Sequence, residues 1–247
     1  MLRVEWDHRV FRASVWMTML AFAAVALFAL LGRWQWHRAV EKRALVAAFD
    51  AGQNAQASEL GERSLAATPR YTLLRLRGRY DGAHQFLLDN ISRDGAVGYE
   101  VLTPFVLEDG RIVAVNRGWL PLPGGRREPL PDVRLPPAPV AEVTGRTDKL
   151  PVTALAIGRA PPDASTSWPK RTSFPNAAQL GAALKSPIED GQLLLAASEP
   201  TGYRRDWHPG ATGFPPSRHI AYALQWWSFG ALALFLYFFL NIERRKP

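Results

Sequence analysis

The chain has 247 residues and no cysteine, and its 30 Lys and Arg residues outnumber its 22 Asp and Glu residues, which gives a formal net charge of +8. The absence of cysteine excludes disulfides, thiolate metal sites, iron–sulfur clusters and the C-x-x-C-H attachment of c-type haem. The positive charge alone would suit nucleic acid. No basic cluster lies within a recognisable nucleic-acid-binding motif, however, so we expect anionic lipid head groups or acidic partners instead.

Two uncharged apolar segments stand out although the mean hydropathy of the whole chain is only −0.12. Ala13–Gly32 has 20 residues and Ile220–Leu240 has 21. At about 1.5 Å per residue each would reach about 30 Å, the thickness of the hydrocarbon core of a bilayer. We therefore predict transmembrane helices at 13–32 and 220–240. Ala24-Val25-Ala26 resembles a signal-peptidase site, but the apolar run continues beyond it, which favours an uncleaved anchor.

The segments flanking the two predicted spans are short, and the bias of their basic residues predicts the orientation. Residues 1–12 and 241–247 are both expected to be cytoplasmic, which places 33–219 outside, in the periplasm of a bacterial inner membrane. Glu5 and Asp7 argue against an acid-poor mitochondrial presequence. The basic residues that carry this prediction are Arg3, Arg9 and Arg12 in the first tail and Arg244, Arg245 and Lys246 in the second.

Between the spans, the pattern predicts an α+β domain. An alanine-rich segment without proline is expected to continue the first helix to about residue 50. Leu74, Leu76, Gly78 and Tyr80 then alternate with Arg75, Arg77 and Arg79, as in a half-buried strand. Segments 84–92, 98–107 and 111–120 are separated by short turns and predict an antiparallel meander, with further strands at 139–147 and 192–198.

A Pro/Ser-rich stretch at 150–176 predicts a long loop, and the segment from Phe174 predicts a short helix. The predicted fold class is therefore a membrane α+β protein: two transmembrane helices flank an external domain with an antiparallel β-sheet and short helices. Neither H-E-x-x-H nor G-x-S-x-G occurs, and the chain has no phosphate-binding glycine loop, so we do not expect an enzyme.

The start of the second predicted span carries polar and aromatic residues. At 100° per residue, one stripe contains His219, Tyr222, Ala223, Trp226, Gly230, Ala233 and Tyr237. Gln225 would lie about 9 Å deeper than His219, where an amide needs a partner. Two interpretations are open: an aromatic belt at the membrane surface, or a site in which His219 ligates haem iron. In the second, the cations expected on the same outer face, Arg33, Arg38, Lys42 and Arg218, would serve the haem propionates.

Four motifs in order resemble the Surfeit locus protein 1 family, whose members assist assembly of haem-copper cytochrome c oxidase. The first is LGRWQWHR followed by Lys42, which carries Gly32, Trp34, Gln35 and Arg38. The second is RLRGRYD, and the third is GYEVLTPF with VNRGWLP. The fourth is RHIAYALQWW, which matches the family's His-x-x-Tyr-Ala-x-Gln-Trp signature. The resemblance covers nearly the whole chain.

This resemblance implies a haem a cofactor, held during biogenesis of oxidase subunit I. It also implies partners: subunit I, other oxidase assembly factors, the haem a synthesis machinery and membrane lipids, but no nucleic acid. His219 matches the family histidine proposed as the axial ligand of the haem iron. The remaining residues implied for the haem site are Tyr222, Gln225 and Trp226 on the second helix, Trp34, Gln35 and Arg38 on the first, and Arg218.

Two rival functions stay open from the sequence. The protein could be a structural chaperone that stabilises an oxidase intermediate without haem, or a membrane enzyme that acts on haem or lipid. Ser217 and Arg218 replace asparagines that some relatives carry, and His37 is a further candidate ligand. In the VNRGWLP segment, we expect Gly118 to supply an unusual backbone angle, whereas Arg117 could either be structural or face a partner.

Overall fold

The computed structural model describes residues 2–6, 9–52, 55–122, 129–135, 141–152, 158–164, 167–208 and 214–244. The chain divides into two compact units, residues 1–47 with 209–247, and residues 48–208. Three parts of the sequence predictions lie outside the described residues: the start of the strand predicted at 139–147, residues 153–157 and 165–166 of the predicted loop, and the tail residues Asp7, Arg245 and Lys246.

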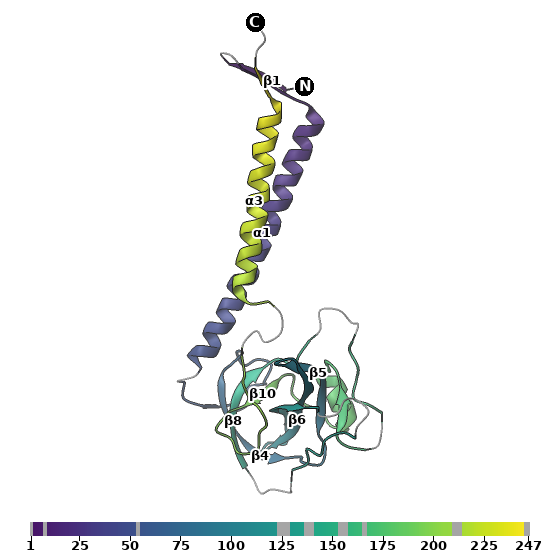
Figure 1. Ribbon diagram of the computed structural model, residues 1–247. Coiled ribbons are helices and arrows are strands. Elements are labelled where there is room, and N and C mark those ends of the chain that lie inside the picture. Colours follow the sequence, from purple (N-terminus) through teal and green to yellow (C-terminus); the bar gives the residue numbers. More distant parts are fainter. Residues whose placement is uncertain are drawn as a thin grey trace. The chain divides into compact units, whose positions relative to one another are not determined.

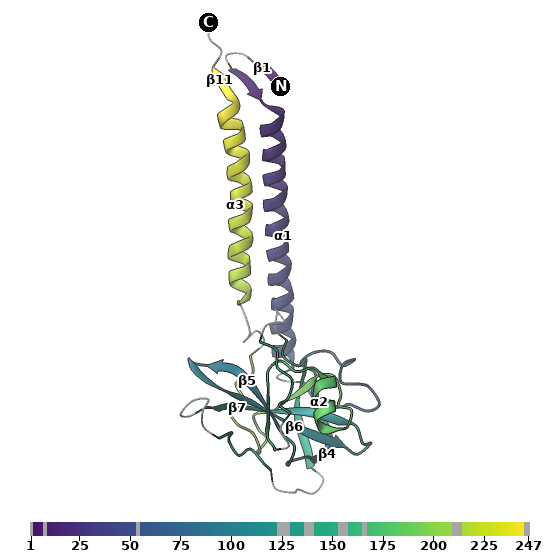
Figure 2. The same ribbon diagram turned by 90° about the vertical axis from the view of Figure 1, so that its right-hand side faces the viewer.

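The first unit is built on two long helices that lie side by side, α1 (Val15–Ala51) and α3 (Pro216–Asn241) (Figures 1 and 2). Helix α1 has 37 residues and continues well past the apolar run to Ala51, which confirms the helix predicted to about residue 50. Proline stands at the first position of α3, where its fixed φ suits a helix start and its missing N–H costs nothing.

The two helices pack along the predicted stripe of α3. Ala223 and Gly230 are buried, and Trp226, Ala233 and Tyr237 are half-buried. Trp226 stacks on Phe28 of α1 with ring centroids 5.8 Å apart, and the Tyr237 hydroxyl lies 2.8 Å from the hydroxyl of Thr18. A Cβ at Gly32 would overlap the indole of Trp227, so this close approach requires glycine. Small residues and interlocked rings therefore fix the register of the pair.

Outside this seam, the helix pair exposes large apolar side chains. Phe22 is 73% exposed and Phe239 66% exposed, and only 6% of the most apolar window of α1 and 11% of that of α3 is buried. Both helices are long and apolar enough to cross a bilayer. Apolar surface on all sides is unstable in water. These features suggest a membrane location.

Both segments expected to be short tails contain strands. Strand β1 (Leu2–Trp6) pairs antiparallel with β2 (Arg9–Ala13), which also pairs antiparallel with β11 (Ile242–Arg244). Phe11 of β2 packs edge-on against Tyr237 of α3 at 5.7 Å. The sequence did not indicate this sheet because three to five residues are too few to show a clear alternation.

The second unit is a β-barrel with a flanking helix (Figure 1). The sheet order is β3-β4-β8-β10-β7-β6-β5-β9, and a further pairing of β4 with β6 closes five of these strands into a ring. A Cβ at Gly78 would overlap Val106 O, so glycine lets β4 and β6 approach closely enough to pair. The strands are β3 (Ser58–Glu59), β4 (Leu73–Tyr80), β5 (Phe86–Arg93), β6 (Ala96–Leu107), β7 (Ile112–Pro121), β8 (Ala141–Asp148), β9 (Lys170–Thr172) and β10 (Gln192–Leu195).

The predicted meander β5-β6-β7 is confirmed as antiparallel, but the sheet as a whole is mixed. Strand β10 runs parallel to β7, with Leu193 opposite Val115, and antiparallel to β8. The pairings β3–β4 and β5–β9 are also parallel. The parallel pairings add to the predicted antiparallel sheet. The sequence does not reveal the pairing of β10, because this strand follows a long connection and no local pattern indicates its partner.

Alternation along the strands builds the core. Leu74 and Leu76 are buried and Arg75 and Arg77 are exposed, as the sequence predicted. The buried side chains meet Phe105 and others inside the ring. Helix α2 (Ala177–Leu184) is the short helix predicted after Phe174, and it begins at a capping box in which Asn176 and Gln179 bond each other's backbone N–H groups.

Candidate functional site

The predicted iron ligand, His219, lies in the first turn of α3 and faces α1. Its Nδ1 atom is 2.7 Å from the side-chain oxygen Oε1 of Gln35. Both side chains are half-buried. The hydrogen bond joins the first and fourth family motifs across the two helices. Gln35 and His219 were both predicted as site residues, on opposite helices, and the structure brings them into direct contact.

Aromatic side chains surround His219 on α3 and in the segment before it. Phe214 lies edge-on to His219 at 6.4 Å between centroids and to Tyr222 at 6.3 Å. Trp226 lies about two helical turns further along the same face of α3, where its ring stacks on Phe28. Neither Phe28 nor Phe214 is among the site residues predicted from the sequence. Phe28 could have been found, because it precedes Gln35 by seven residues and so shares its face of α1, whereas Phe214 precedes the helix and no periodicity places it.

Cationic side chains lie near the same histidine. Arg38 and Lys42 follow Gln35 by three and seven residues, so they share the face of α1 that meets His219. Arg38 also donates from Nη1 to Glu41 Oε2 at 2.9 Å, with both side chains exposed. The guanidinium of Arg218 lies over the Phe214 ring at 5.1 Å. This part of the helix pair therefore combines one imidazole, aromatic rings and positive charge.

The other predicted residues lie at the edge of this cluster. Trp34 is 54% exposed and Gln225 is also exposed, and helical rotation turns both away from the seam, toward the side that carries Tyr222. Trp36 and Trp227 pack together at 6.0 Å on the opposite side. The Nε2 atom of His37 accepts from Arg33 Nε at 3.4 Å. Since His37 follows Gln35 by two residues, it lies on the far side of α1 from His219.

The VNRGWLP motif has a structural position inside the barrel unit. Arg117 is 4% exposed. Its Nη1 donates to Gln85 Oε1 at 2.9 Å and to Val133 O at 3.0 Å, and its Nε donates to Thr201 O at 2.8 Å. Burial lowers the pKa of the Arg117 guanidinium. The open question about Arg117 is thus resolved: it ties strands and loops together and does not face a partner.

Gly118 follows with a positive φ of +110°. A Cβ there would lie 2.6 Å from Arg204 O, so the residue needs both the backbone angle and the space of glycine. The unusual backbone angle expected from the sequence is confirmed, but Gly118 lies within strand β7 and not in a turn after it. Trp119 is also buried, and its Nε1 donates to Ile91 O at 3.1 Å.

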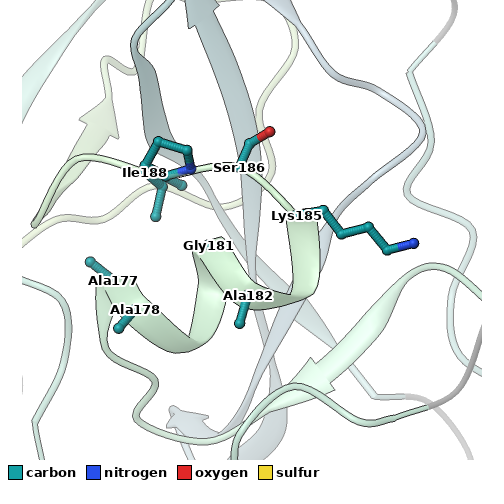
Figure 3. Close-up of a pocket in the computed structure, with 8 residues that line it drawn as sticks. Ala177, Ala178, Gly181, Ala182, Lys185, Ser186 and Ile188 are labelled. Atoms are coloured by element: carbon teal, nitrogen blue, oxygen red, sulfur yellow. The ribbon is translucent and has the colours of Figure 1, made fainter.

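A shallow hollow on the barrel unit lies beside α2, lined by small side chains and the following turn (Figure 3). Ala177, Ala178 and Ala182 face it, together with Lys185 and Ser186. These groups offer neither a nucleophile with an adjacent base nor a set of metal ligands. The cluster around His219 is therefore the better candidate site.

Fold and site together define a class of protein. Its β-barrel domain lies in the sequence between two helices able to cross a membrane, and a histidine with aromatic and basic neighbours lies where the second helix begins. The model of the SURF1 family matches residues 22–231, and the chain belongs to this family. The family is generally linked to cytochrome oxidase assembly, and its assembly factors are non-enzymatic.

Among curated proteins, the chain is similar to uncharacterised SURF1-like proteins of Mycobacterium bovis and of two strains of Mycobacterium tuberculosis. Each is 29% identical over 162 residues, which cover 62% of this chain and 55% of the relative. The match thus spans just over half the length of these relatives.

Proposed function

We propose that this chain is a membrane-bound assembly factor for a haem-copper cytochrome c oxidase, and that it binds haem a at the His219 cluster and assists its insertion into subunit I. It acts as a binding protein and not as an enzyme. The single observation that supports the proposal most is the half-buried imidazole of His219, held from the opposite helix by Gln35 at 2.7 Å. Family membership supplies the oxidase context.

The residues present fit a haem. A flat amphipathic ligand needs an axial nitrogen, apolar or aromatic walls and cations for its carboxylates. His219 would supply the nitrogen, and Tyr222, Phe214 and Trp226 would supply walls. Arg38 and Arg218 would pair with the propionates, and Trp34 and Gln225 would contribute from the exposed side. When bound, haem a is the cargo, and the protein's own task is to hold it and keep it from aggregating.

The orientation forms part of the same proposal. The candidate spans are 13–32 and 220–240, with both termini cytoplasmic and residues 33–219 periplasmic in a bacterial inner membrane. His219 would then lie at the outer surface of the bilayer. Partners would be subunit I, other oxidase assembly factors, the haem a synthesis machinery and membrane lipids.

The test is the absorption spectrum of the protein purified from cells that also make haem a. We expect a Soret band with about one haem per chain. Colourless protein that still co-purifies with subunit I would overturn haem binding and favour a structural chaperone that stabilises a subunit intermediate. Colourless protein without subunit I would overturn the assembly role as well.

A further inference from the structure

The contact between His219 and Gln35 determines which nitrogen of the imidazole is available. The atom that faces Nδ1 is Oε1 of Gln35, at 2.7 Å. An amide oxygen can only accept a hydrogen bond, so Nδ1 carries the hydrogen. A neutral imidazole protonated at Nδ1 has its lone pair on Nε2. The geometry therefore leaves Nε2 as the basic, ligand-competent nitrogen.

Packing around this contact fixes the position of Gln35 along the axis of α3. Phe28 precedes Gln35 by seven residues and Trp226 follows His219 by seven, and their rings stack at 5.8 Å. Between these two contacts, Gly32 admits the indole of Trp227. Because two contacts two helical turns apart fix the antiparallel register, the amide cannot slide along α3 without breaking the stack.

We propose that Gln35 is a positioning residue for the metal ligand: it fixes the tautomer and the ring orientation of His219, directs Nε2 to the iron and raises the basicity of that nitrogen. A hydrogen-bond acceptor on the remote nitrogen of a ligating histidine has these effects in other metal sites, and its loss there costs about 10–100-fold in affinity. Gln35 itself does not contact the iron. The inference rests on the proposed function, and it names the role of one residue in it.

A purely structural glutamine would differ in a measurable way. A half-buried amide between two apolar helices also stabilises their packing, so a loss of stability alone would not separate the two roles. The tautomer of His219 and the electronic state of a bound haem respond to the direction and strength of the hydrogen bond. Packing alone would leave both unchanged.

The first experiment needs no haem. The protein is labelled with ¹⁵N-histidine in lipid nanodiscs and its imidazole nitrogens are observed by NMR at a pH where His219 is neutral. The signals that His219→Ala removes identify this residue among the five histidines. We expect the Nδ1–H tautomer in the wild type and a mixture in Gln35→Leu. An Nε2–H tautomer in the wild type would overturn the inference, since the amide would then donate to Nδ1 and Nε2 would be closed.

The second experiment uses protein loaded with haem a, and compares Gln35→Glu, Gln35→Leu and His37→Leu. The carboxylate of Gln35→Glu accepts more strongly, so we expect it to retain haem with a lower midpoint potential, whereas Gln35→Leu should lose affinity about 10–100-fold. His37→Leu, on the far side of α1, should match the wild type. An unchanged potential in Gln35→Glu would overturn the positioning role. A wild type that binds no haem would overturn the proposed function while leaving the NMR result intact.

Discussion

The barrel unit and the helix pair each contain a conspicuous polar residue within a family motif, but they hold it differently. In the barrel unit, Arg117 is 4% exposed and donates hydrogen bonds to Gln85, Val133, Thr201 and, at 3.5 Å, Thr103. In the helix pair, His219 is only half-buried, its Nδ1 atom lies 2.7 Å from Gln35 Oε1, and the exposed rings of Phe214 and Tyr222 lie beside it. A buried group with several hydrogen bonds stabilises a fold, whereas a half-buried group held from one helix is available to a ligand.

This difference shows that two motifs of similar appearance can have different physical roles. Arg117, Gly118 and Trp119 of VNRGWLP lie inside the barrel unit, so we expect their substitution to lower its stability. His219 and Tyr222 of RHIAYALQWW lie on a largely exposed helix, so we expect their substitution to weaken ligand binding. Substitutions in each unit can therefore test whether the two motifs differ in this way.

The largest expected effect concerns the side of the membrane on which each part lies. Because the chain has no cysteine, Glu62→Cys and Arg12→Cys would each create a single reactive thiol. We expect a membrane-impermeant maleimide added to spheroplasts to label the first fully and the second only after lysis. Labelling of both, or of position 12 alone, would contradict the proposed orientation.

Next comes the buried arginine. Arg117→Ala removes the hydrogen bonds to Gln85 Oε1, Val133 O and Thr201 O. Thr103 still donates to Gln85 Oε1 and Gln85 Nε2 still donates to Val133 O, but the lost charge-assisted hydrogen bonds and the lost packing of a buried side chain make a loss of about 3 kcal/mol the expected result. Chemical denaturation followed by tryptophan fluorescence measures it. The matched control is Arg79→Ala, whose side chain is exposed and which should change stability by less than about 0.5 kcal/mol. Equal effects would refute the structural role of Arg117.

A smaller loss is expected for Gly118→Ala. The new Cβ would meet Arg204 O at 2.6 Å in a backbone with φ of +110°, which should cost about 1–3 kcal/mol. Gly110 also has a positive φ, +87°, but a Cβ there meets nothing within 4 Å, so Gly110→Ala should cost only about 1 kcal/mol. The difference between the denaturation midpoints of the two variants measures the cost of the contact between the new Cβ and Arg204 O. A larger loss for Gly110→Ala would show that the close approach is unimportant.

The smallest expected effects lie in the helix pair. A Cβ at Gly32 overlaps the indole of Trp227, whereas one at Gly230 reaches only ordinary contact with Phe28 Cβ at 3.6 Å. Gly32→Ala should therefore lower the melting temperature of the helical circular dichroism signal in detergent, and Gly230→Ala should leave it nearly unchanged. The reverse order would mean that the helices pack through a different seam.

Much of this architecture could be predicted from the sequence because it repeats a local pattern. The helices over 15–51 and 216–241 follow from uncharged apolar runs and an alanine-rich continuation, and β4 follows from the alternation of leucines with arginines. The seam of α3 follows from helical spacing, since Ala223 and Gly230 are buried where the stripe placed them.

The parts that could not be predicted depend on contacts between distant segments. Closure of the barrel requires β4 to meet β6 and β10 to lie between β7 and β8, and no local periodicity encodes such pairings. In the candidate site, the motif indicates Gln35, but its hydrogen bond to His219 joins residues 184 positions apart. This contact depends on how the two helices are aligned, which the motif does not encode. Phe214 lies outside any periodic element, so only the folded chain brings it to the histidine.

Whether His219 holds the iron is tested by the haem a content per folded chain of His219→Ala, beside that of His208→Ala in the barrel unit. Pyridine haemochrome spectra give the content, and the melting temperature of each variant confirms folding. We expect His219→Ala to melt like the wild type but to bind at least about 10-fold less haem, as for removal of an axial ligand, whereas His208→Ala should keep its haem. A His219→Ala variant that is folded and fully loaded with haem would contradict the claim that this histidine holds the iron.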